Sequence, residues 1–374
     1  MKPRQTRTTG AARGRRARLA VSIGCPCGVG AEVSVAAAAE SEARVLLIGD
    51  AALIADAAEM RGVDDSRLVR VTRPTQAWQL PEGSIGVFQP TTSLVPKDRA
   101  SGAPTPASGA AQLAWINAAC DLVSRNEADA MVTGPVSKDA IARSRAPGSA
   151  GFLGHTEHLQ RRLGAREVVM AFWSEPLTTA LVTTHLPLAA VPRAITAVAV
   201  ARAAFWLGVL LTKLGVARAE GARLAVAGLN PHAGESGLLG DEEIESIAPG
   251  IETARKRLAR ERVSVVLVGP VPAESAFRRA VAGDYDGVVA MYHDQATIPM
   301  KLVGFGEAVN VSLGLPIVRT SVDHGTAYDR AGQGTADPRG MGEAMSLASR
   351  LVIGGRERAA TPARAASRRK SSRR

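Results

Sequence analysis

The sequence predicts an α/β protein built on a mainly parallel sheet that helices cover on both faces. Short runs rich in Val, Leu, Ile and Ala alternate with helical patterns along the whole chain. Strands that are apolar at every residue, rather than at alternate residues, are typical of parallel strands buried on both faces. With 374 residues, 46% of them hydrophobic, the chain can bury a large core, as two domains or as one large lobed unit.

Each predicted element rests on one of these runs. The predicted strands are 18–23, 44–48, 130–132, 168–172, 179–183, 223–227, 263–267 and 286–290. The predicted helices are 32–43, 108–124, 137–143, 196–214, 241–258 and 340–353. In an open α/β sheet, ligands bind beyond the carboxyl ends of the strands. Because the unusual motifs of this chain follow predicted strands, we expect them to gather along one edge of the sheet.

The net charge of +11 comes from the two ends of the chain. Residues 1–18 hold seven Lys or Arg and no acid, and residues 356–374 hold eight against one acid, which leaves −3 for the rest. A nucleic-acid groove needs its positive charge on the folded part, so specific nucleic-acid binding is excluded. Basic tails rich in Arg, Ser and Ala, over 1–17 and 355–374, predict disorder; weak electrostatic attachment to polyanions is the alternative.

Neither a membrane span nor a secretory signal is predicted. The apolar stretch 194–211 contains Arg202 at its middle, so a buried helix or a subunit contact explains it better than a membrane span. The apolar run near the N-terminus is too short for a signal peptide. Three cysteines give no disulfide framework and suit a reducing cytoplasm.

All six histidines lie in short, unusual motifs, and three of them closely follow predicted strands. These are His185 in Thr-Thr-His-Leu-Pro, His232 in Asn-Pro-His-Ala-Gly-Glu and His293 in Met-Tyr-His-Asp-Gln. Three imidazoles and an open position are typical of a catalytic zinc site. Their spacing fits no zinc finger, so the fold must bring them together; ordinary hydrogen-bonded loop histidines are the alternative. Asp294 could orient a ligand or act as a base.

Two further segments carry groups suited to anions. Lys301, Asn310 and Arg319 surround an apolar strand and suit a phosphorylated or carboxylated substrate, although surface salt bridges would explain them equally well. The stretch 133–138, Thr-Gly-Pro-Val-Ser-Lys, ends a strand and opens a helix, which is typical of an anion site or of an ordinary capped turn. The glycine-rich stretch 24–32 does not match the Gly-x-Gly-x-x-Gly pattern of a Rossmann fold.

The last motif covers residues 323–337, Asp-His-Gly-Thr-Ala-Tyr-Asp-Arg-Ala-Gly-Gln-Gly-Thr-Ala-Asp. Small residues beside one histidine and one polar partner allow a flat ring to stack and to be recognised at its edge. An ordinary loop is the alternative.

Taken together, these motifs resemble the 4-hydroxythreonine-4-phosphate dehydrogenase family of the vitamin B6 pathway. The matching pieces are Thr-Gly-Pro-Val-x-Lys, Gly-His-Thr-Glu, Thr-Thr-His-Leu-Pro-Leu, Gly-Leu-Asn-Pro-His-Ala-Gly-Glu, Ala-Met-Tyr-His-Asp-Gln, Asn-Val-x-Leu-Gly-Leu-Pro and Arg-Thr-Ser-Val-Asp-His-Gly-Thr-Ala. Their order covers about residues 18–354. The final loop also resembles the adenine-binding loop of isocitrate and isopropylmalate dehydrogenases, whose fold the family shares.

The resemblance implies two α/β/α lobes with mainly parallel sheets that flank a central cleft. Residues 18–145 with 316–354 would form the dinucleotide-side domain, and 146–315 the metal, substrate and dimerisation domain. The chain would be a cytoplasmic homodimer whose active site lies at the interface, with one metal ligand supplied across it. The implied reaction is the metal-dependent, NAD-linked oxidation of 4-phosphohydroxy-L-threonine at C3, followed by decarboxylation to 3-amino-2-oxopropyl phosphate.

The resemblance also assigns residues to roles. His185, His232 and His293 match the ligands of a divalent metal, for which zinc is expected first, with magnesium or cobalt as alternatives. Substrate contacts are His155, Thr156, Lys301, Asn310 and Arg319, and Asp294 and Lys301 are the catalytic candidates. The NAD or NADP contacts are His324, Gly325, Thr326, Ala327 and Asp337.

Two segments depart from the family pattern. In its first loop, Cys25 replaces an acidic residue and Cys27 replaces an alanine, and later Glu274 replaces an aspartate. The alternatives are therefore a paralogue that oxidises 4-phospho-D-threonate, the erythronate or a cyclic diol dicarboxylate, a three-histidine zinc hydrolase, and an inactive binding protein. Failure to bind NAD⁺ would favour the hydrolase, and retained metal without turnover would favour the inactive protein.

Overall fold

The computed structural model describes residues 16–216 and 218–371, with side chains as far as residue 355. Its strands are β1 Arg18–Ser22, β2 Arg44–Ile48, β3 Leu68–Arg70, β4 Ile85–Phe88, β5 Ala130–Thr133, β6 Val169–Trp173, β7 Thr178–Leu181, β8 Ala222–Ala227, β9 Val265–Val271, β10 Gly287–Ala290, β11 Val309–Leu313 and β12 Arg319–Val322. Its α-helices are α1 Gly30–Glu40, α2 Ala51–Met60, α3 Pro106–Ser124, α4 Lys138–Arg143, α5 His155–Leu163, α6 Val191–Ala194, α7 Ala197–Lys213, α8 Ala248–Arg260, α9 Ala273–Val281, α10 His293–Val303 and α11 Arg339–Ser371.

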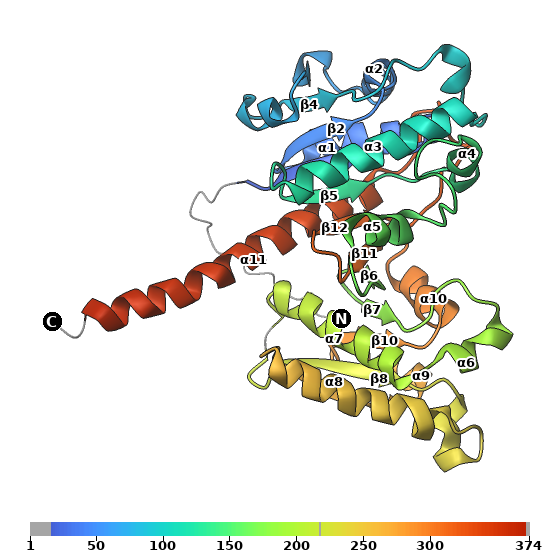
Figure 1. Cartoon of the computed structure of the whole chain (residues 1–374), viewed down its shortest axis with the longest axis vertical. Helices are drawn as coiled ribbons and strands as arrows, with labels where there is room; N and C mark the ends of the chain where they lie inside the picture. Colours follow the sequence, from blue (N-terminus) through green and yellow to red (C-terminus); the bar gives the residue numbers. More distant parts are fainter. Residues whose placement is uncertain (1–15, 217, 372–374) are drawn as a thin grey trace.

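Over the described residues, the strands form one continuous sheet in the order β3-β4-β2-β1-β5-β12-β11-β6-β7-β10-β8-β9 (Figure 1). The block from β3 to β12 is parallel, and so is the block from β7 to β9. Between them, β11 and β6 pair antiparallel with each other and with their outer neighbours. The two parallel blocks therefore run in opposite directions.

The predicted α/β class with a mainly parallel sheet is confirmed, and two details differ. One sheet crosses the whole molecule instead of two separate sheets, because β11 and β6 hydrogen-bond the two blocks together. Most of the motifs expected to gather do line one pocket, although the two blocks run in opposite directions; His232 and Lys301 lie outside it. The predicted division into 18–145 with 316–354 and 146–315 stays a prediction.

Helices cover both faces of the sheet, as the fully apolar strands predict. In β8, Leu224 and Val226 join the core that includes Leu207 of α7, whereas Ala225 and Ala227 join a second core with Phe277 of α9. Successive side chains of a strand point to opposite faces, so β8 separates two helix layers. Side-chain caps start several helices; Asp50 accepts hydrogen bonds from Ala52 N and Leu53 N at the start of α2, for example.

Helix α11 runs into a segment that was predicted to be disordered. Its first part packs on β5, β12 and α1, and Gly354 lies so close to α7 that a Cβ atom there would be 2.5 Å from Lys213 O. Beyond this contact the helix leaves the body of the molecule (Figure 1). The helix is assigned as far as Ser371, and the disorder predicted over 355–374 stays a prediction. Ala and Arg favour helix, and the packed first part removes the cost of nucleation. The predicted tail over 1–17 lies almost wholly outside the described residues.

The predicted buried helix over 194–211 is present as α7. Its inner face includes Val200, Ala204, Leu207 and Leu211, all buried. Within the described residues, no single helix has both the length and the apolar character to cross a membrane. One bent pair, Leu188–Ala194 with Ala197–Lys213 at 90°, meets that test on length and composition only.

Candidate active site

One pocket of about 260 Å³ lies where the two oppositely directed blocks meet. Segments that are far apart in the sequence line it: the loop after β5, the start of α5, strands β6, β11 and β12, and the loops after β7, β10 and β12. The lining residues are Gly134, Pro135, Val136, Lys138, Gly154, His155, Thr156, Glu157, Met170, Phe172, His185, His293, Asn310, Arg319, Ser321, Val322, Asp323, His324 and Gly325.

A buried arginine is the strongest electrostatic feature of this pocket. Arg319 is only 3% exposed, and its Nη2 and Nη1 atoms donate to Thr133 Oγ1 at 2.6 Å and Ser312 Oγ at 3.0 Å. Among the described residues, its Nε has no hydrogen-bond partner and no carboxylate pairs with the guanidinium. Burial lowers the pKa of Arg319 to about 10, so the group stays charged at neutral pH. A buried cation with neutral partners and an unused donor is suited to an anionic ligand.

His155 stands beside this arginine as a neutral imidazole. It is the first residue of α5, and its Nε2 is shielded from solvent without a hydrogen-bond partner in the described structure. Burial, then the cations of Arg319 and Lys138, hold the pKa of His155 well below its usual value. The neighbouring Thr156 hydroxyl lies 3.2 Å from Ser312 Oγ, which ties α5 to β11. The Nε2 atom of a neutral His155 can therefore form one hydrogen bond with a ligand that Arg319 attracts.

Two of the three predicted metal ligands come together. The rings of His185 and His293 lie 5.5 Å apart between centroids, at the wall of the pocket. Asp294 Oδ1 lies 2.7 Å from His293 Nδ1, which leaves His293 Nε2 for a ligand. Burial and the cation of Lys138 lower the pKa of His185, which favours the neutral form that binds metals.

His232 does not join them within one chain. It is exposed on the segment Pro231–Gly237 that follows β8, with a φ of +53°, and it is absent from the pocket wall. In the sheet, β10 lies between β7 and β8, so the loop after β7, which holds His185, and the segment after β8, which holds His232, leave the sheet at separate places. The described residues contain no group of three His, Cys, Asp or Glu side chains placed to hold a metal ion. The pair His185 and His293 fits a divalent metal by donor type, but a third donor has to come from elsewhere.

Lys301 lies outside the pocket wall as well. It is exposed in the last turn of α10, and its positive charge acts on Asp323 of the pocket wall. Burial raises the pKa of Asp323, and the positive charge of Lys301 opposes that shift.

The structure adds Lys138, Glu157 and Asp323 to the predicted site residues. Each is part of a motif that was recognised, but composition does not say which side chain of a motif points inward.

The predicted dinucleotide loop rests on the glycine-rich loop near the N-terminus. His324 and Gly325 reach the pocket, and Thr326 O accepts a hydrogen bond from Val29 N at 3.0 Å. A Cβ atom on Gly28 would lie 2.5 Å from Thr326 O, so this close approach needs glycine. Ala327 follows with a φ of +45°. Asp337 is exposed and pairs with Arg339 at 2.8 Å, outside the pocket wall.

The buried carboxylate of Glu32 holds the rest of this loop. It accepts hydrogen bonds from Gly332 N at 2.7 Å and Gly334 N at 3.0 Å. The stretch 24–32 is therefore a support for the 323–334 loop. This arrangement agrees with the absence of a Rossmann pattern in it.

Neither departure from the family pattern lies in the pocket wall. Cys25 is buried behind it, next to Tyr328, and Glu274 is on the exposed surface of α9, where it pairs with Arg278. The donors that face a ligand are unchanged by both.

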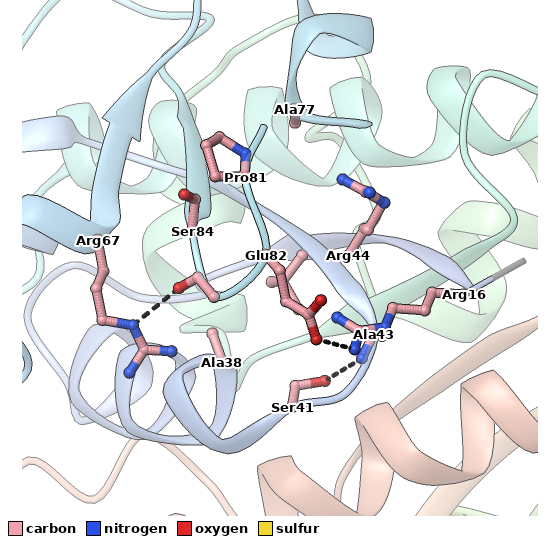
Figure 2. A pocket seen from close by; sticks show the side chains of 12 residues that line it. Arg16, Ala38, Ser41, Ala43, Arg44, Arg67, Ala77, Pro81, Glu82 and Ser84 are labelled. Atoms are coloured by element: carbon pink, nitrogen blue, oxygen red, sulfur yellow. Dashed lines mark hydrogen bonds and ion pairs between the residues drawn. The ribbon is translucent and has the colours of Figure 1, made fainter. Parts of the chain in front are cut away.

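A second hollow is too small for a substrate. It lies at the amino-terminal ends of β1, β2 and β4, the edge opposite to the carboxyl ends of β5 and β12 (Figure 2). Arg44 donates to Leu80 O at 2.9 Å, Arg67 donates to Gly83 O at 2.8 Å, and Arg16 pairs with Glu82. Its volume of about 30 Å³ equals the space that about one water molecule occupies in the liquid. These arginines therefore have structural partners.

The fold and the site together define an α/β protein whose pocket is suited to a small anionic molecule, with a histidine pair beside the buried cation. The sequence profile described as "Pyridoxal phosphate biosynthetic protein PdxA" matches residues 41–348. The chain belongs to this family. It is 42% identical over 310 residues, 82% of this chain and 86% of the relative, to the 4-hydroxythreonine-4-phosphate dehydrogenase of Desulfosudis oleivorans.

Solved structures show the same architecture. The crystal structure of 4-hydroxythreonine-4-phosphate dehydrogenase from Klebsiella pneumoniae matches with a TM-score of 0.75 and 30% identity, over 91% of this chain and 99% of that one. A terephthalate 1,2-cis-dihydrodiol dehydrogenase from Burkholderia xenovorans matches with a TM-score of 0.62 and 29% identity, over 90% and 98%.

Proposed function

We propose that the protein is a 4-hydroxythreonine-4-phosphate dehydrogenase of pyridoxal phosphate biosynthesis. It oxidises 4-phosphohydroxy-L-threonine at C3, and the resulting β-keto acid loses CO₂ to leave 3-amino-2-oxopropyl phosphate. The observation that carries the proposal is the unpaired, buried guanidinium of Arg319, which shares one pocket with the histidine pair. Family membership supports the same reaction.

Arg319 and His155 hold the anionic end of the substrate. The charged Nε of Arg319 donates to an anionic oxygen, while the neutral His155 Nε2 and the Thr156 hydroxyl satisfy neighbouring oxygens. Asn310 lies 3.5 Å from Arg319 Nη1 and keeps the guanidinium in place. These groups orient the substrate rather than make bonds.

His185 and His293 would hold a divalent cation, zinc first, with magnesium or cobalt as alternatives. Bound there, the cation supplies Lewis acidity, which lowers the pKa of the substrate alcohol. Asp294 fixes the ring of His293 through the 2.7 Å contact at Nδ1 and is the candidate for the proton relay. Lys301, at the end of the same helix, supplies positive charge near Asp323.

NAD, or NADP, would bind along the loop that holds His324, Gly325, Thr326 and Ala327, and it supplies the hydride acceptor. The support for this assignment is the position of the loop beside the pocket and its close packing on Gly28. Asp337 stands further along the same segment, where its carboxylate already pairs with Arg339.

The active unit is a homodimer in which His232 of the second copy completes the metal site. His232 is exposed, and its own chain offers it no partner ligand among the described residues. Large apolar side chains are exposed near the histidine loops, including Leu188 at 69%, Leu302 at 80% and Phe305 at 80%. The segment with α6 and helix α10 both lie on the right-hand side of Figure 1. An apolar surface of this kind is typical of an obligate interface.

The test follows NADH absorbance with 4-phosphohydroxy-L-threonine and NAD⁺, with and without a chelator. We expect activity that the chelator abolishes and that a divalent metal restores. Activity unaffected by chelator would contradict the metal's role, and activity only with 4-phospho-D-threonate would contradict the substrate.

A second candidate is a paralogue that oxidises a cyclic diol dicarboxylate. The structural match to the dihydrodiol dehydrogenase favours it, because a carboxylate also satisfies Arg319. Comparison of kcat/KM for the phosphorylated amino acid and for a cyclic diol dicarboxylate distinguishes the two.

A further inference from the structure

Two cysteines lie one residue apart in a turn that the proposed reaction does not use. Gly28 N donates to Cys25 O at 3.2 Å, so Cys25, Pro26 and Cys27 are the first three residues of a β-turn between β1 and α1. Two residues along an extended chain span at most about 7 Å, and a turn brings them closer. Their Cα atoms therefore fall within the roughly 4.4–6.8 Å that a disulfide bridges.

Both thiols are enclosed, and each has one further contact. Cys25 is 0% exposed with its Sγ 3.6 Å from Tyr328 Oη, and Cys27 is 1% exposed with its Sγ donating to Asp98 O at 3.4 Å. Interaction with the Cys27 thiol lowers the pKa of Cys25 to about 7, against the opposing effect of burial. The same interaction and burial raise the pKa of Cys27. The opposite directions of the two shifts favour Cys25 as the thiolate and Cys27 as the protonated partner.

We propose that Cys25 and Cys27 form a site of reversible dithiol oxidation, with a hydroperoxide as the oxidant. The Cys25 thiolate attacks one peroxide oxygen, the O–O bond breaks, and the released hydroxide takes a proton to become water. The Cys27 sulfur then attacks the sulfenic acid on Cys25, and a second water leaves as the S–S bond forms. Two thiols and one hydrogen peroxide give one disulfide and two waters; an external dithiol reverses the change.

The turn is mechanically connected to the loop beside the pocket. Gly28 and Val29, directly after Cys27, pack and hydrogen-bond on Thr326 O, and Tyr328 covers Cys25. Closing the disulfide removes the Cys25–Tyr328 and Cys27–Asp98 contacts and reshapes the turn under Thr326. We therefore expect oxidation to displace the 323–328 loop and to slow the dehydrogenase. This second consequence rests on the proposed function, whereas the oxidation itself does not.

The chemical test uses the full chain, hydrogen peroxide, an acid quench and alkylation in denaturant. The chain has three free cysteines in the structure, and we expect one alkylated thiol after oxidation, on Cys120, and three after dithiothreitol. Peptide masses should show the loss of two hydrogens within the segment that holds Cys25 and Cys27. Three free thiols after peroxide, or a bridge that includes Cys120, would overturn the proposal.

Matched variants separate a dithiol from a single reactive thiol. Cys120→Ala should still close the bridge. Cys27→Ala, which installs the residue usual in the family, should stop at a sulfenic acid that dimedone captures. If Cys27→Ala gives no trapped sulfenic acid, Cys25 is not the attacking thiol and the proposal fails.

The functional test compares NADH production before peroxide, after peroxide and after dithiothreitol. The rate should fall in proportion to the bridged fraction and recover with it, while the double variant Cys25→Asp, Cys27→Ala keeps its rate throughout. An unchanged rate in the fully bridged protein would refute the link to the loop. A protein without dehydrogenase activity before treatment would instead refute the proposed function, and the thiol count would still decide the oxidation site.

Discussion

Replacing Arg319 with methionine tests whether this buried cation exists for the ligand or for the fold. The side chain of methionine fills a similar volume without charge. Burial lowers the pKa of Arg319 to about 10, well below its usual value, so enclosing the charge costs about 3 kcal/mol. The hydrogen bonds to Thr133, Ser312 and Asn310 return about 1 kcal/mol each. The two contributions nearly cancel, so the Arg319→Met variant should unfold within a few degrees of the parent.

Activity should respond very differently. An anionic substrate that accepts one charge-assisted hydrogen bond from Arg319 Nε loses about 1.5–3 kcal/mol when it is removed. We therefore expect kcat/KM to fall by roughly 10 to 10². Thermal unfolding by circular dichroism and initial rates of NADH formation give the two numbers. The exposed Arg278→Met on α9 is the matched control and should change neither.

Two results would refute this reasoning. A variant that keeps kcat/KM within a factor of three would show that the anion binds elsewhere. A variant that loses more than about 4 kcal/mol of stability would show that Arg319 is a structural residue, because a loss of that size is typical of breaking a buried charge pair.

Three more predictions follow from particular contacts. If His232 of a second copy completes each metal site, refolding a mixture of inactive His185→Ala and His232→Ala chains should restore about a quarter of the activity. The reason is that half of the dimers then contain one chain of each kind and hold one intact site of two. If no activity is recovered, all three ligands belong to one chain. The pKa of His155 is lowered below the 6.5 of the unfolded chain, so the unfolded state binds more protons as pH falls below about 6.5, and the free energy of unfolding should decrease there. Urea unfolding of His155→Gln between pH 7 and 5 should show a shallower decrease, and His158 contributes in the same direction in both proteins. The same pH dependence in the variant and the parent would contradict a neutral His155. Gly28→Ala places a methyl 2.5 Å from Thr326 O and should raise KM for NAD⁺ several-fold. Gly342→Ala, with nothing within 4 Å of the added atom, is the control and should leave KM unchanged. Equal KM values for the two variants would show that this loop does not contact the dinucleotide.

The local pattern predicted the elements better than their assembly. All eight predicted strands exist, because continuous apolar runs such as Arg44–Ile48 have no other stable place than a covered sheet. Strands β3, β4, β11 and β12 were not assigned. In β11, Asn310 and Ser312 interrupt the apolar pattern, since they point to the pocket and to Arg319. These polar residues weakened the apolar pattern that identifies a buried strand.

The amino-acid sequence by itself determined the α/β class and the family, and it supplied the candidate site residues. The fold class and the family motifs depend on residue types over a few neighbouring positions, so they can be recognised without knowledge of the fold. Only the tertiary structure decided that β11 and β6 reverse the chain direction at the middle of the sheet. It also decided that His155, Arg319, His185 and His293 share one pocket while His232 and Lys301 do not. Convergence of distant loops depends on strand order and direction, which are set by long-range hydrogen bonds and packing rather than by any local run of residues.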